Sequence, residues 1–392
     1  MKSRAIIQIG GSVLQRHTMA WAQDAGLKVL LTDSSADAYL KDTADAFHQA
    51  DGTDGQAILE QAQVWLEHYD IVEVYAGGDF GLKSAAYVAE ALGIPHCVPD
   101  AVDISLSKDR ALEKFRAAGL TVPKRTDEHS AASHLPVIVK PKDSSGSRGV
   151  TFVEDAADLA AALQHARQYS SDIIIEHWVD GRHIDVNGIL WHGDFYGCEV
   201  IERFFSPLPL RYPLGMVTPP KDLTEADREK IFDTLARAAK ATGINHGPVK
   251  GDFIMTRDEI VVLEIAPRFH GETNTYSAPH AYGSCSARDY MMALGAEKPP
   301  ITQHYGAPKS IAGWAAIFPE TTGRLREVQG VENALALPGI TDVVVRRGPG
   351  FTVNAIKDNT AVIGFIYGHA ANHEMLDQLL VEARKTITVE ME

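Results

Sequence analysis

The chain of 392 residues is too long for one ordinary hydrophobic core, and its length predicts two or three domains. Its 52 acidic and 37 basic residues give a formal charge of −15, which argues against nucleic acid as a partner because phosphate binding needs a basic surface. No run approaches about 18 consecutive apolar residues, so we expect no membrane span, and the widely separated cysteines favour the reducing cytoplasm.

The N-terminal part of the chain alternates strands with helices. Three apolar runs predict strands, at 4–9, 28–32 and 71–76. Three helical stretches follow them in turn, near 18–25, 56–68 and 84–93. This alternation predicts a small α/β domain with a parallel sheet. The Gly10-Gly11 turn and Asp33 imitate a dinucleotide-binding fingerprint, but GxGxxG is absent, so the turn is expected to leave room for another ligand at the carboxyl ends of the strands.

The pattern changes beyond the first domain. Ser107 is a plausible N-cap for a helix that Gly119 and Pro123 stop. The next strands are expected at 137–141, 149–153, 172–179 and 183–191, with a helix at 155–168 among them. A third unit follows, with a helix at 224–242 and strands at 249–255 and 259–265. The tail is predicted to be rich in strands, with a late helix at 373–385.

The hairpin 249–268 carries the strongest chemical signal. If its turn is centred on TRDE, Asp252 and Glu264 face each other with Cβ atoms roughly 5 Å apart. Two facing carboxylates repel, so we expect a cation between or above them, and Mg²⁺ is the natural candidate because it prefers oxygen ligands. The alternative is a surface salt-bridge cluster with Lys250 and Arg268, which a period of two places on the same face.

Lys140 ends a predicted strand and is followed by the polar loop DSSGSRG at 143–149. N–H groups of such a loop can cradle phosphate oxygens, and a lysine adds a point charge. The loop is no Walker A motif, because GxxxxGK followed by Ser or Thr occurs nowhere in the chain, and an ordinary solvent loop is the alternative. Lys108, in the first turn of its helix, carries no weight alone.

Taken together, these segments resemble the ATP-grasp superfamily. The motifs SKDRALEKFRAAGLTVP, VIVKPKDSSGSRGV, IIIEHWVDGRHIDV and VVLEIAPR follow one another in the family's order. The tail, with GRLREVQGVENALALPGI and VVVRRGPG, resembles the C-terminal domain of L-amino-acid ligases. The resemblance implies an α/β ATP-grasp fold with a Rossmann-like pre-ATP-grasp domain at 1–103, an ATP-grasp domain at 104–304 whose lid spans about 121–190, and a β-rich C-terminal domain at 305–392.

The resemblance also assigns roles by position. It implies that Lys108 and Lys140 contact the ATP phosphates and that Ser144, Ser145, Gly146, Ser147 and Gly149 form a lid loop over them. The segment that binds adenine would be Glu176, His177, Trp178 and Val179. His183 and Asp185 would lie near the ribose. Asp252 and Glu264 match the magnesium carboxylates, in agreement with the hairpin, and Mn²⁺ is a possible substitute. Arg268 matches the arginine that steadies the acyl phosphate, and Lys140 is the other residue expected to be catalytic.

One position departs from the family pattern. Many members have EINPR, whose Asn binds a second metal ion, whereas this chain has EIAPR with Ala266. A second metal would rely on Asp252, Glu264 and phosphates alone, or on another side chain. His270 and Asn274 are candidates for phosphate or substrate contact, with a structural loop histidine as the alternative for His270.

Arg346 and Arg347 follow the apolar run VVV and precede a Gly-Pro-Gly turn. Such a turn could aim one guanidinium at a substrate carboxylate, which arginine binds bidentately. The alternative is a solvent-exposed pair.

The resemblance predicts an enzyme that uses ATP and Mg²⁺ to activate a small-molecule carboxylate as an acyl phosphate and then joins it to an amine. The alternative is a bicarbonate-activating carboxylase, suggested by His183 and Asp185, although no biotinyl-acceptor sequence such as AMKM is present. A nucleotide-binding regulator without turnover is disfavoured by the intact set of charged motif residues. The expected partners are the carboxylate and amine substrates, without nucleic acid or membrane, and a homodimer is an analogy.

Overall fold

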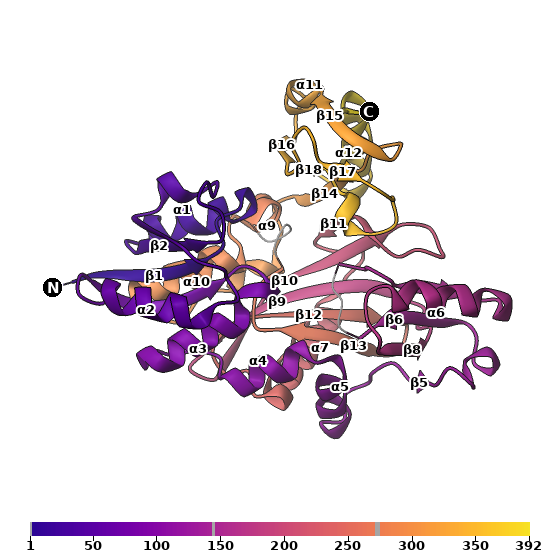
Figure 1. The fold of residues 1–392 in the computed structure, drawn as a ribbon, viewed down its shortest axis with the longest axis horizontal. Coiled ribbons are helices and arrows are strands. Elements are labelled where there is room, and N and C mark those ends of the chain that lie inside the picture. The colour runs from indigo at the N-terminus through magenta and orange to yellow at the C-terminus, as the bar shows by residue number, and fades with distance from the viewer. Residues whose placement is uncertain (1, 143–145, 271–274) are drawn as a thin grey trace.

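The computed structural model describes residues 2–142, 146–270 and 275–392. Ser144, Ser145 and Asn274, three of the predicted site residues, lie outside these ranges. A large central sheet connects the other parts of the molecule, with the N-terminal α/β part at one end, a small lid sheet at the other and the C-terminal strands above (Figure 1).

The N-terminal part is built on a parallel sheet in the order β3-β2-β1-β4. Its strands are β1 (Ser3–Ile9), β2 (Lys28–Asp33), β3 (Ala46–Gln49) and β4 (Tyr69–Ala76). Its helices are α1 (Arg16–Asp24), α2 (Gly55–Trp65), α3 (Leu82–Leu92) and α4 (Pro99–Leu106). Ile6 and Ile7 are fully buried in two different clusters, one on each face, which is why β1 is an unbroken apolar run.

The lid is an antiparallel sheet in the order β5-β8-β6-β7. Its strands are β5 (Arg125–Thr126), β6 (Val137–Pro141), β7 (Thr151–Val153) and β8 (Ile173–His177). Helix α5 (Lys108–Ala117) leads into the lid, and α6 (Leu159–Arg167) packs on the sheet. Alternate residues of β6, Val137 and Val139, are fully buried against α6, as the period of two predicts.

The central sheet has eight strands in the order β13-β12-β9-β10-β11-β14-β18-β16. They are β9 (Arg182–Trp191), β10 (Asp194–Phe205), β11 (Pro213–Thr218), β12 (Gly247–Met255), β13 (Ile260–Ala266), β14 (Ile311–Ile317), β16 (Ile340–Val345) and β18 (Gly364–Ala370). The helices of this region are α7 (Glu225–Thr242), α9 (Ala278–Tyr282) and α10 (Ser286–Ala296). Thr224 and Asp227 form a capping box at the start of α7, and Gly243, at φ 87°, ends the helix.

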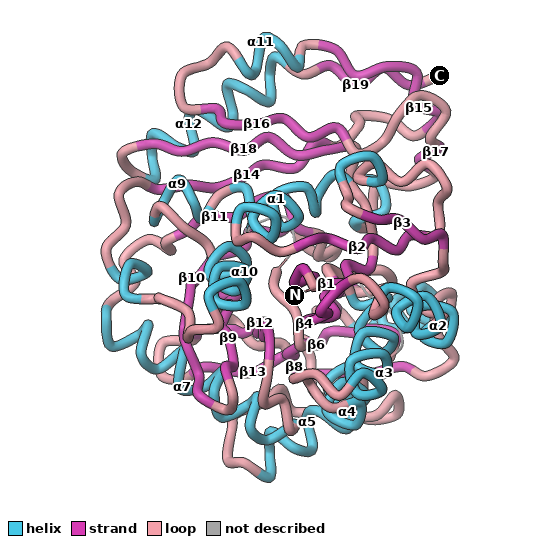
Figure 2. The backbone as a smooth tube through the Cα atoms, turned by 90° about the vertical axis from the view of Figure 1, so that its left-hand side faces the viewer, coloured by secondary structure: helices cyan, strands magenta, loops and turns pink. Residues whose placement is uncertain are grey.

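The C-terminal part adds β15 (Gly323–Gln329), β17 (Thr352–Val353), β19 (Thr388–Met391), α11 (Val331–Leu335) and α12 (His373–Thr386). Strands β15, β17 and β19 form a small sheet of their own. Strands β14, β18 and β16 run side by side and continue the central sheet, because β14 pairs with β11 (Figure 2). The C-terminal part is β-rich, as predicted, and it shares a sheet with the preceding part.

The predicted α/β fold is confirmed, and each strand range expected from the sequence overlaps a strand of the structure. The sequence analysis did not identify β10 and β11, which carry the connection between the central strands and β14. In β10, charged and small residues interrupt the apolar run as FYGCEVIERFF, so no simple alternation marks it. Among the residues that the structure describes, none of the helices is long and apolar enough to cross a membrane.

Candidate active site

The β12–β13 hairpin places two carboxylates face to face. Asp252 pairs with Glu264, as predicted. Nearer the turn, Phe253 pairs with Val262, so the register shifts by one residue at a bulge and Leu263 is the extra residue. Without this bulge Asp252 would face Leu263. The bulge therefore brings the two carboxylates together.

Lys250 supplies a cation to this pair. Its Nζ donates to Asp252 Oδ2 at 2.9 Å and to Glu264 Oε1 at 2.5 Å, and the residue is only 2% exposed. Burial disfavours the charge, but the two carboxylates outweigh burial and raise the pKa of Lys250. The salt-bridge alternative is thus realised in part, in a buried cluster rather than on the surface.

Asp252 lies beside two further basic side chains. Its Oδ1 lies 2.9 Å from His270 Nε2 and 3.7 Å from Arg203 Nη2. Burial would raise the pKa of Asp252, but Lys250, His270 and Arg203 outweigh it and hold that pKa well below its usual range. The carboxylate therefore stays ionised although it is enclosed.

Asp185 lies next to Asp252 on β9 and is 2% exposed. Arg203 Nε donates to Asp185 Oδ2 at 2.6 Å, which balances the second buried charge. One ligand atom from each of Asp185, Asp252 and His270 lies within 4.8 Å of the others. The structure thus places Asp185 beside the carboxylate pair, and its role near the ribose stays a prediction.

The donor atoms of this cluster fit a hard divalent cation. Asp252 Oδ1 is buried and makes no hydrogen bond of good geometry within the described chain, and the Glu264 side chain is 40% exposed. Carboxylate oxygens of this kind suit Mg²⁺, and the His270 imidazole adds a nitrogen donor that Mn²⁺ accepts. Ala266 offers no side-chain ligand, so any second metal site would have to use other residues.

Arg268 is held by the N-terminal part of the molecule. Its Nε donates to Asp79 Oδ1 at 2.6 Å and its Nη2 to Asp79 Oδ2 at 2.9 Å, a bidentate pair. Its Nη1 donates to the Phe269 carbonyl at 3.1 Å. The arginine therefore points to the loop after β4, and it does not join Lys250 in the salt-bridge cluster.

The two predicted phosphate lysines lie at the base of the lid. Lys140 Nζ donates to Glu176 Oε2 at 2.5 Å, and Arg125 Nε lies 3.5 Å from the other oxygen of this buried glutamate. Lys108 Nζ donates to the Lys142 carbonyl at 3.0 Å. The structure thus joins Lys140 to Glu176, the first residue of the predicted adenine segment.

The described part of the lid loop has a left-handed backbone. Gly146, Ser147 and Gly149 have φ values of 67°, 61° and 75°. A Cβ on Gly149 would come within 2.7 Å of the Tyr169 ring, so only glycine fits there. The Asn359 N–H of the C-terminal part donates to the Gly146 carbonyl at 3.4 Å, so the lid loop touches the far end of the chain.

The predicted adenine segment joins β8 to β9. The N–H groups of His177 and Trp178 donate to carbonyls of the lid itself, at 2.8 and 2.9 Å. These two N–H groups are therefore already hydrogen-bonded within the lid. For the predicted contact with adenine, the segment still offers its carbonyl groups and the backbone of Val179.

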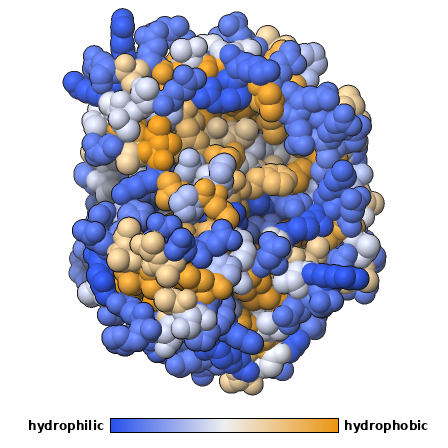
Figure 3. Space-filling view, turned by 90° about the vertical axis from the view of Figure 1, so that its right-hand side faces the viewer, coloured by the Kyte–Doolittle hydropathy of each residue, from blue (hydrophilic) through white to orange (hydrophobic). Residues whose placement is uncertain are grey.

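A buried histidine and an arginine flank this segment. The His183 ring lies 4.5 Å from that of Phe205, and burial, with help from Arg211, lowers the pKa of His183 to about 3. The Arg211 guanidinium lies over Phe205 at 4.5 Å and over Trp178 at 5.3 Å, and burial lowers its pKa too. On the lid side, apolar residues gather where the surface is hollowed, inside a hydrophilic rim (Figure 3).

Arg346 and Arg347 lie away from this cluster, in the C-terminal part. Both N–H groups donate to the Ile363 carbonyl, at 2.9 and 3.2 Å. Their guanidinium groups pack over the rings of Phe365 and Phe351, at 5.8 and 4.4 Å. Both are partly buried, and a substrate role for either stays a prediction.

Three residues of the site were not singled out from the sequence: Asp79, Arg203 and Arg211. Asp79 lies in the glycine-rich loop GGDFG at the carboxyl end of β4, and this position was its only signal. Arg203 and Arg211 belong to β10 and to the loop that follows it, a segment that the sequence analysis left unassigned.

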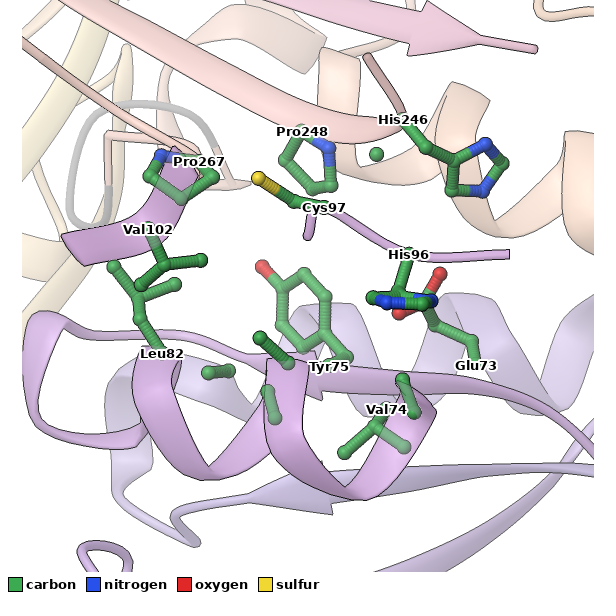
Figure 4. Close-up of a pocket in the computed structure, with 15 residues that line it drawn as sticks. Glu73, Val74, Tyr75, Leu82, His96, Cys97, Val102, His246, Pro248 and Pro267 are labelled. Atoms are coloured by element: carbon green, nitrogen blue, oxygen red, sulfur yellow. The ribbon is translucent and has the colours of Figure 1, made fainter. Parts of the chain in front are cut away.

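A small cavity of about 40 Å³ lies behind the site, between the N-terminal part and the central sheet (Figure 4). Glu73, His96 and His246 line it from different elements, and Tyr75 lies across it from Cys97. Its volume suits one water molecule rather than a substrate. We assign it to the packing of the two parts.

Comparisons with known proteins agree with this geometry. Residues 106–272 match the model of the ATP-grasp domain, and residues 315–392 match L-amino acid ligase C-terminal domain 2. The uncharacterized protein y4rH of Sinorhizobium fredii is 23% identical over 356 residues, which cover 86% of this chain and 72% of the relative. A D-alanine–D-alanine ligase of Citrifermentans bemidjiense is 33% identical over 151 residues, which cover 34% of this chain and 50% of that one.

Solved structures share the fold over the full chain. L-amino acid ligase from Bacillus licheniformis has a TM-score of 0.81 at 18% identity, and both chains are covered completely. N5-carboxyaminoimidazole ribonucleotide synthetase from Thermotoga maritima has a TM-score of 0.75 at 17% identity, again with complete coverage of both.

The chain contains an ATP-grasp domain over residues 106–272, as predicted, and its residues 315–392 match the C-terminal domain 2 of L-amino acid ligases. The ligases that it is similar to are ATP-dependent enzymes that form C–N bonds.

Proposed function

We propose that this protein uses ATP and Mg²⁺ to convert a small-molecule carboxylate into an acyl phosphate and joins the acyl group to an amine. The observation that carries the proposal is the facing pair of Asp252 and Glu264, to both of which the buried Lys250 donates, with the pKa of Asp252 held well below its usual range. The similarity to D-alanine–D-alanine ligases and to an L-amino acid ligase supports an amino acid as one of the substrates.

In this proposal the charged side chains of the protein bind the ATP phosphates and stabilise the transferred group. Lys140 and Lys108 attract the ATP phosphates from the lid side, where their charge offsets that of the transferred group. The substrate carboxylate attacks the γ-phosphorus, the bond to the β-phosphate oxygen breaks, and ADP leaves. The amine nitrogen then attacks the acyl carbon, the carbon–oxygen bond breaks, and phosphate leaves as the nitrogen loses a proton.

Asp252 and Glu264 would hold the magnesium ion, with His270 beside them. When bound, Mg²⁺ neutralises phosphate charge and orients the γ-phosphate. Asp79 fixes the Arg268 guanidinium, so that its charge is already in place before the acyl phosphate forms. Closure of the lid over the phosphates would keep water away from that intermediate.

The test is to trap the acyl phosphate with hydroxylamine. Small carboxylates, amino acids first, are incubated with ATP, Mg²⁺ and hydroxylamine, and hydroxamate is measured together with ADP. The proposal expects hydroxamate with the true acyl donor and none with Glu264→Gln. ADP release that never yields hydroxamate would contradict it and indicate direct phosphoryl transfer to another group.

The same assay addresses the carboxylase alternative. A strict need for bicarbonate, with no hydroxamate from organic acids, would favour a bicarbonate-activating carboxylase. ATP binding without ADP release on any substrate would indicate a regulator.

A further inference from the structure

A larger cavity, of about 180 Å³, lies between the N-terminal sheet and the segment after β13. Three parallel strands end at it, with Gly10 and Gly11 after β1, Asp33 at the end of β2 and Gly77 after β4. Ligands of open α/β sheets bind at the carboxyl ends of the strands. The cavity therefore has the position of a ligand site.

The two glycine turns keep this volume open. Gly10 has a φ of 98°, and a Cβ on Gly77 would come within 2.2 Å of Gln15 Nε2. The Gln15 side chain lies across both turns, where its Oε1 accepts from the Ser12 N–H at 3.1 Å. The backbone of the two turns and one amide side chain thus form one wall of the cavity.

The charge of the lining defines the class of ligand. Asp33 is the only carboxylate among the described lining residues, and none of those residues is a lysine or an arginine. Asp33 accepts from the N–H groups of Gly11 and Ser35, at 2.7 and 2.8 Å, and a carboxylate has further acceptor positions. Burial raises the pKa of the Tyr75 phenol, so this lining residue stays neutral. The cavity suits a cationic donor and disfavours a phosphate.

The cavity also adjoins the reacting groups. Phe269 and His270 form one wall, directly after Arg268, and His270 Nε2 lies 2.9 Å from Asp252 Oδ1. A nucleophile in the cavity would thus approach the position where the acyl group is activated. The volume equals that of about six water molecules, which limits the ligand to a small molecule.

We propose that this cavity binds the amine nucleophile, as a small amine without a phosphate group, with Asp33 facing its amino group. The inference rests on the proposed function and names the class of its second substrate. A phosphorylated amine, such as a ribonucleotide, would bring its negative charge to a lining that contains Asp33 and, among its described residues, no lysine or arginine.

The test compares amines of matched size with the carboxylate that gives hydroxamate. Ethanolamine and glycinamide should support amide formation in the wild-type protein, and O-phosphoethanolamine should be at least about tenfold poorer in kcat/KM, because its phosphate would be buried unpaired. A preference for the phosphorylated amine would overturn the inference. Absence of hydroxamate in the wild-type protein would instead contradict the proposed function.

One variant probes the lining directly. Asp33→Asn should raise the KM of the amine about tenfold, as expected for loss of a charged hydrogen bond, and should leave the KM of ATP within about twofold. Asp37→Asn, an exposed neighbour, is the matched control. An unchanged amine KM in Asp33→Asn would overturn the inference.

Discussion

Two sets of carboxylates that are largely shielded from solvent in this chain are accommodated in opposite ways. Glu73 accepts a hydrogen bond from the Tyr290 hydroxyl, and Glu199 accepts from Asn187 Nδ2 at 3.0 Å and Ser286 Oγ at 2.8 Å. Burial raises the pKa of both to about 7, although these hydrogen bonds favour the ionised form. Asp252 is also enclosed, but its neighbours hold its pKa well below the usual range.

The difference lies in the partners. Neutral donors do not replace the hydration of a carboxylate, whereas Lys250 and Arg203 bring full charges. Glu73 and Glu199 thus connect elements of the structure, while Asp252 remains an anion that a metal can use. The following predictions test this comparison, from the largest expected effect to the smallest.

Lys250→Met removes the cation between Asp252 and Glu264. Because it leaves two facing carboxylates without their partner, it should lower the free energy of unfolding by about 3–5 kcal/mol. Urea unfolding measures this, and Mg²⁺ should restore part of the loss. Lys240→Met, on the exposed face of α7, is the control. Equal stability of the two variants would mean that the carboxylates need no buried cation.

Glu73→Gln should change how stability depends on pH. The unfolded glutamate titrates near 4.5 and the folded one at about 7, so the wild-type stability from this group is fully present below 4.5 and is lost as pH rises towards 7. Above pH 7 the variant should be more stable than the wild type, by at most about 3 kcal/mol.

The measurement is a series of unfolding curves from pH 4 to pH 8, with Glu67→Gln, on the surface, as control. Glu199 shifts in the same direction, so only the difference between Glu73→Gln and the wild type is diagnostic. A difference that does not vary with pH would show that Glu73 has the same pKa in the folded and the unfolded protein.

Glu264→Gln should lower ADP release at least about a hundredfold, because the amide cannot hold the metal as the carboxylate does. The melting temperature should change little, since the side chain is 40% exposed. Glu259→Gln, exposed on the same hairpin, should keep the wild-type rate. Turnover in Glu264→Gln equal to that of this control would remove the metal role.

Asp79→Asn should weaken the bidentate ion pair that positions the Arg268 guanidinium. Loss of one charged, bidentate partner predicts a fall of about tenfold in kcat/KM for the carboxylate, with the KM of ATP unchanged. Asp70→Asn, exposed on β4, is the matched control. If both variants behave alike, Arg268 does not depend on the N-terminal part for its position.

Much of the fold follows from local patterns in the sequence. The apolar runs of β1, β2 and β4 and the stop signals of their helices give the N-terminal domain directly, because both faces of its sheet are buried. Strand β10 could not be found in this way, because its side chains serve the core, the Arg203 charge network and the surface in turn. The continuity of the central sheet with the C-terminal strands depends on β10 and β11. It could therefore not be predicted from the sequence.

The site was predictable where neighbours in sequence make the chemistry. Asp252 and Glu264 belong to one hairpin, so their pairing could be derived, although the bulge at Leu263 that produces it could not. Asp79 meets Arg268 across 189 positions of the chain, and Arg203 meets His270 across 67. Contacts of this kind arise from packing between parts, which no local pattern encodes.

The transfer of a labelled oxygen tests the central claim most directly. The acyl donor is supplied with ¹⁸O in its carboxylate, the reaction is run with ATP, Mg²⁺ and the amine, and the phosphate released is analysed by mass spectrometry. An acyl phosphate places one carboxylate oxygen between carbon and phosphorus, so each phosphate should carry one ¹⁸O. Unlabelled phosphate formed together with amide would contradict the account, because the carboxylate would then never have attacked the γ-phosphorus.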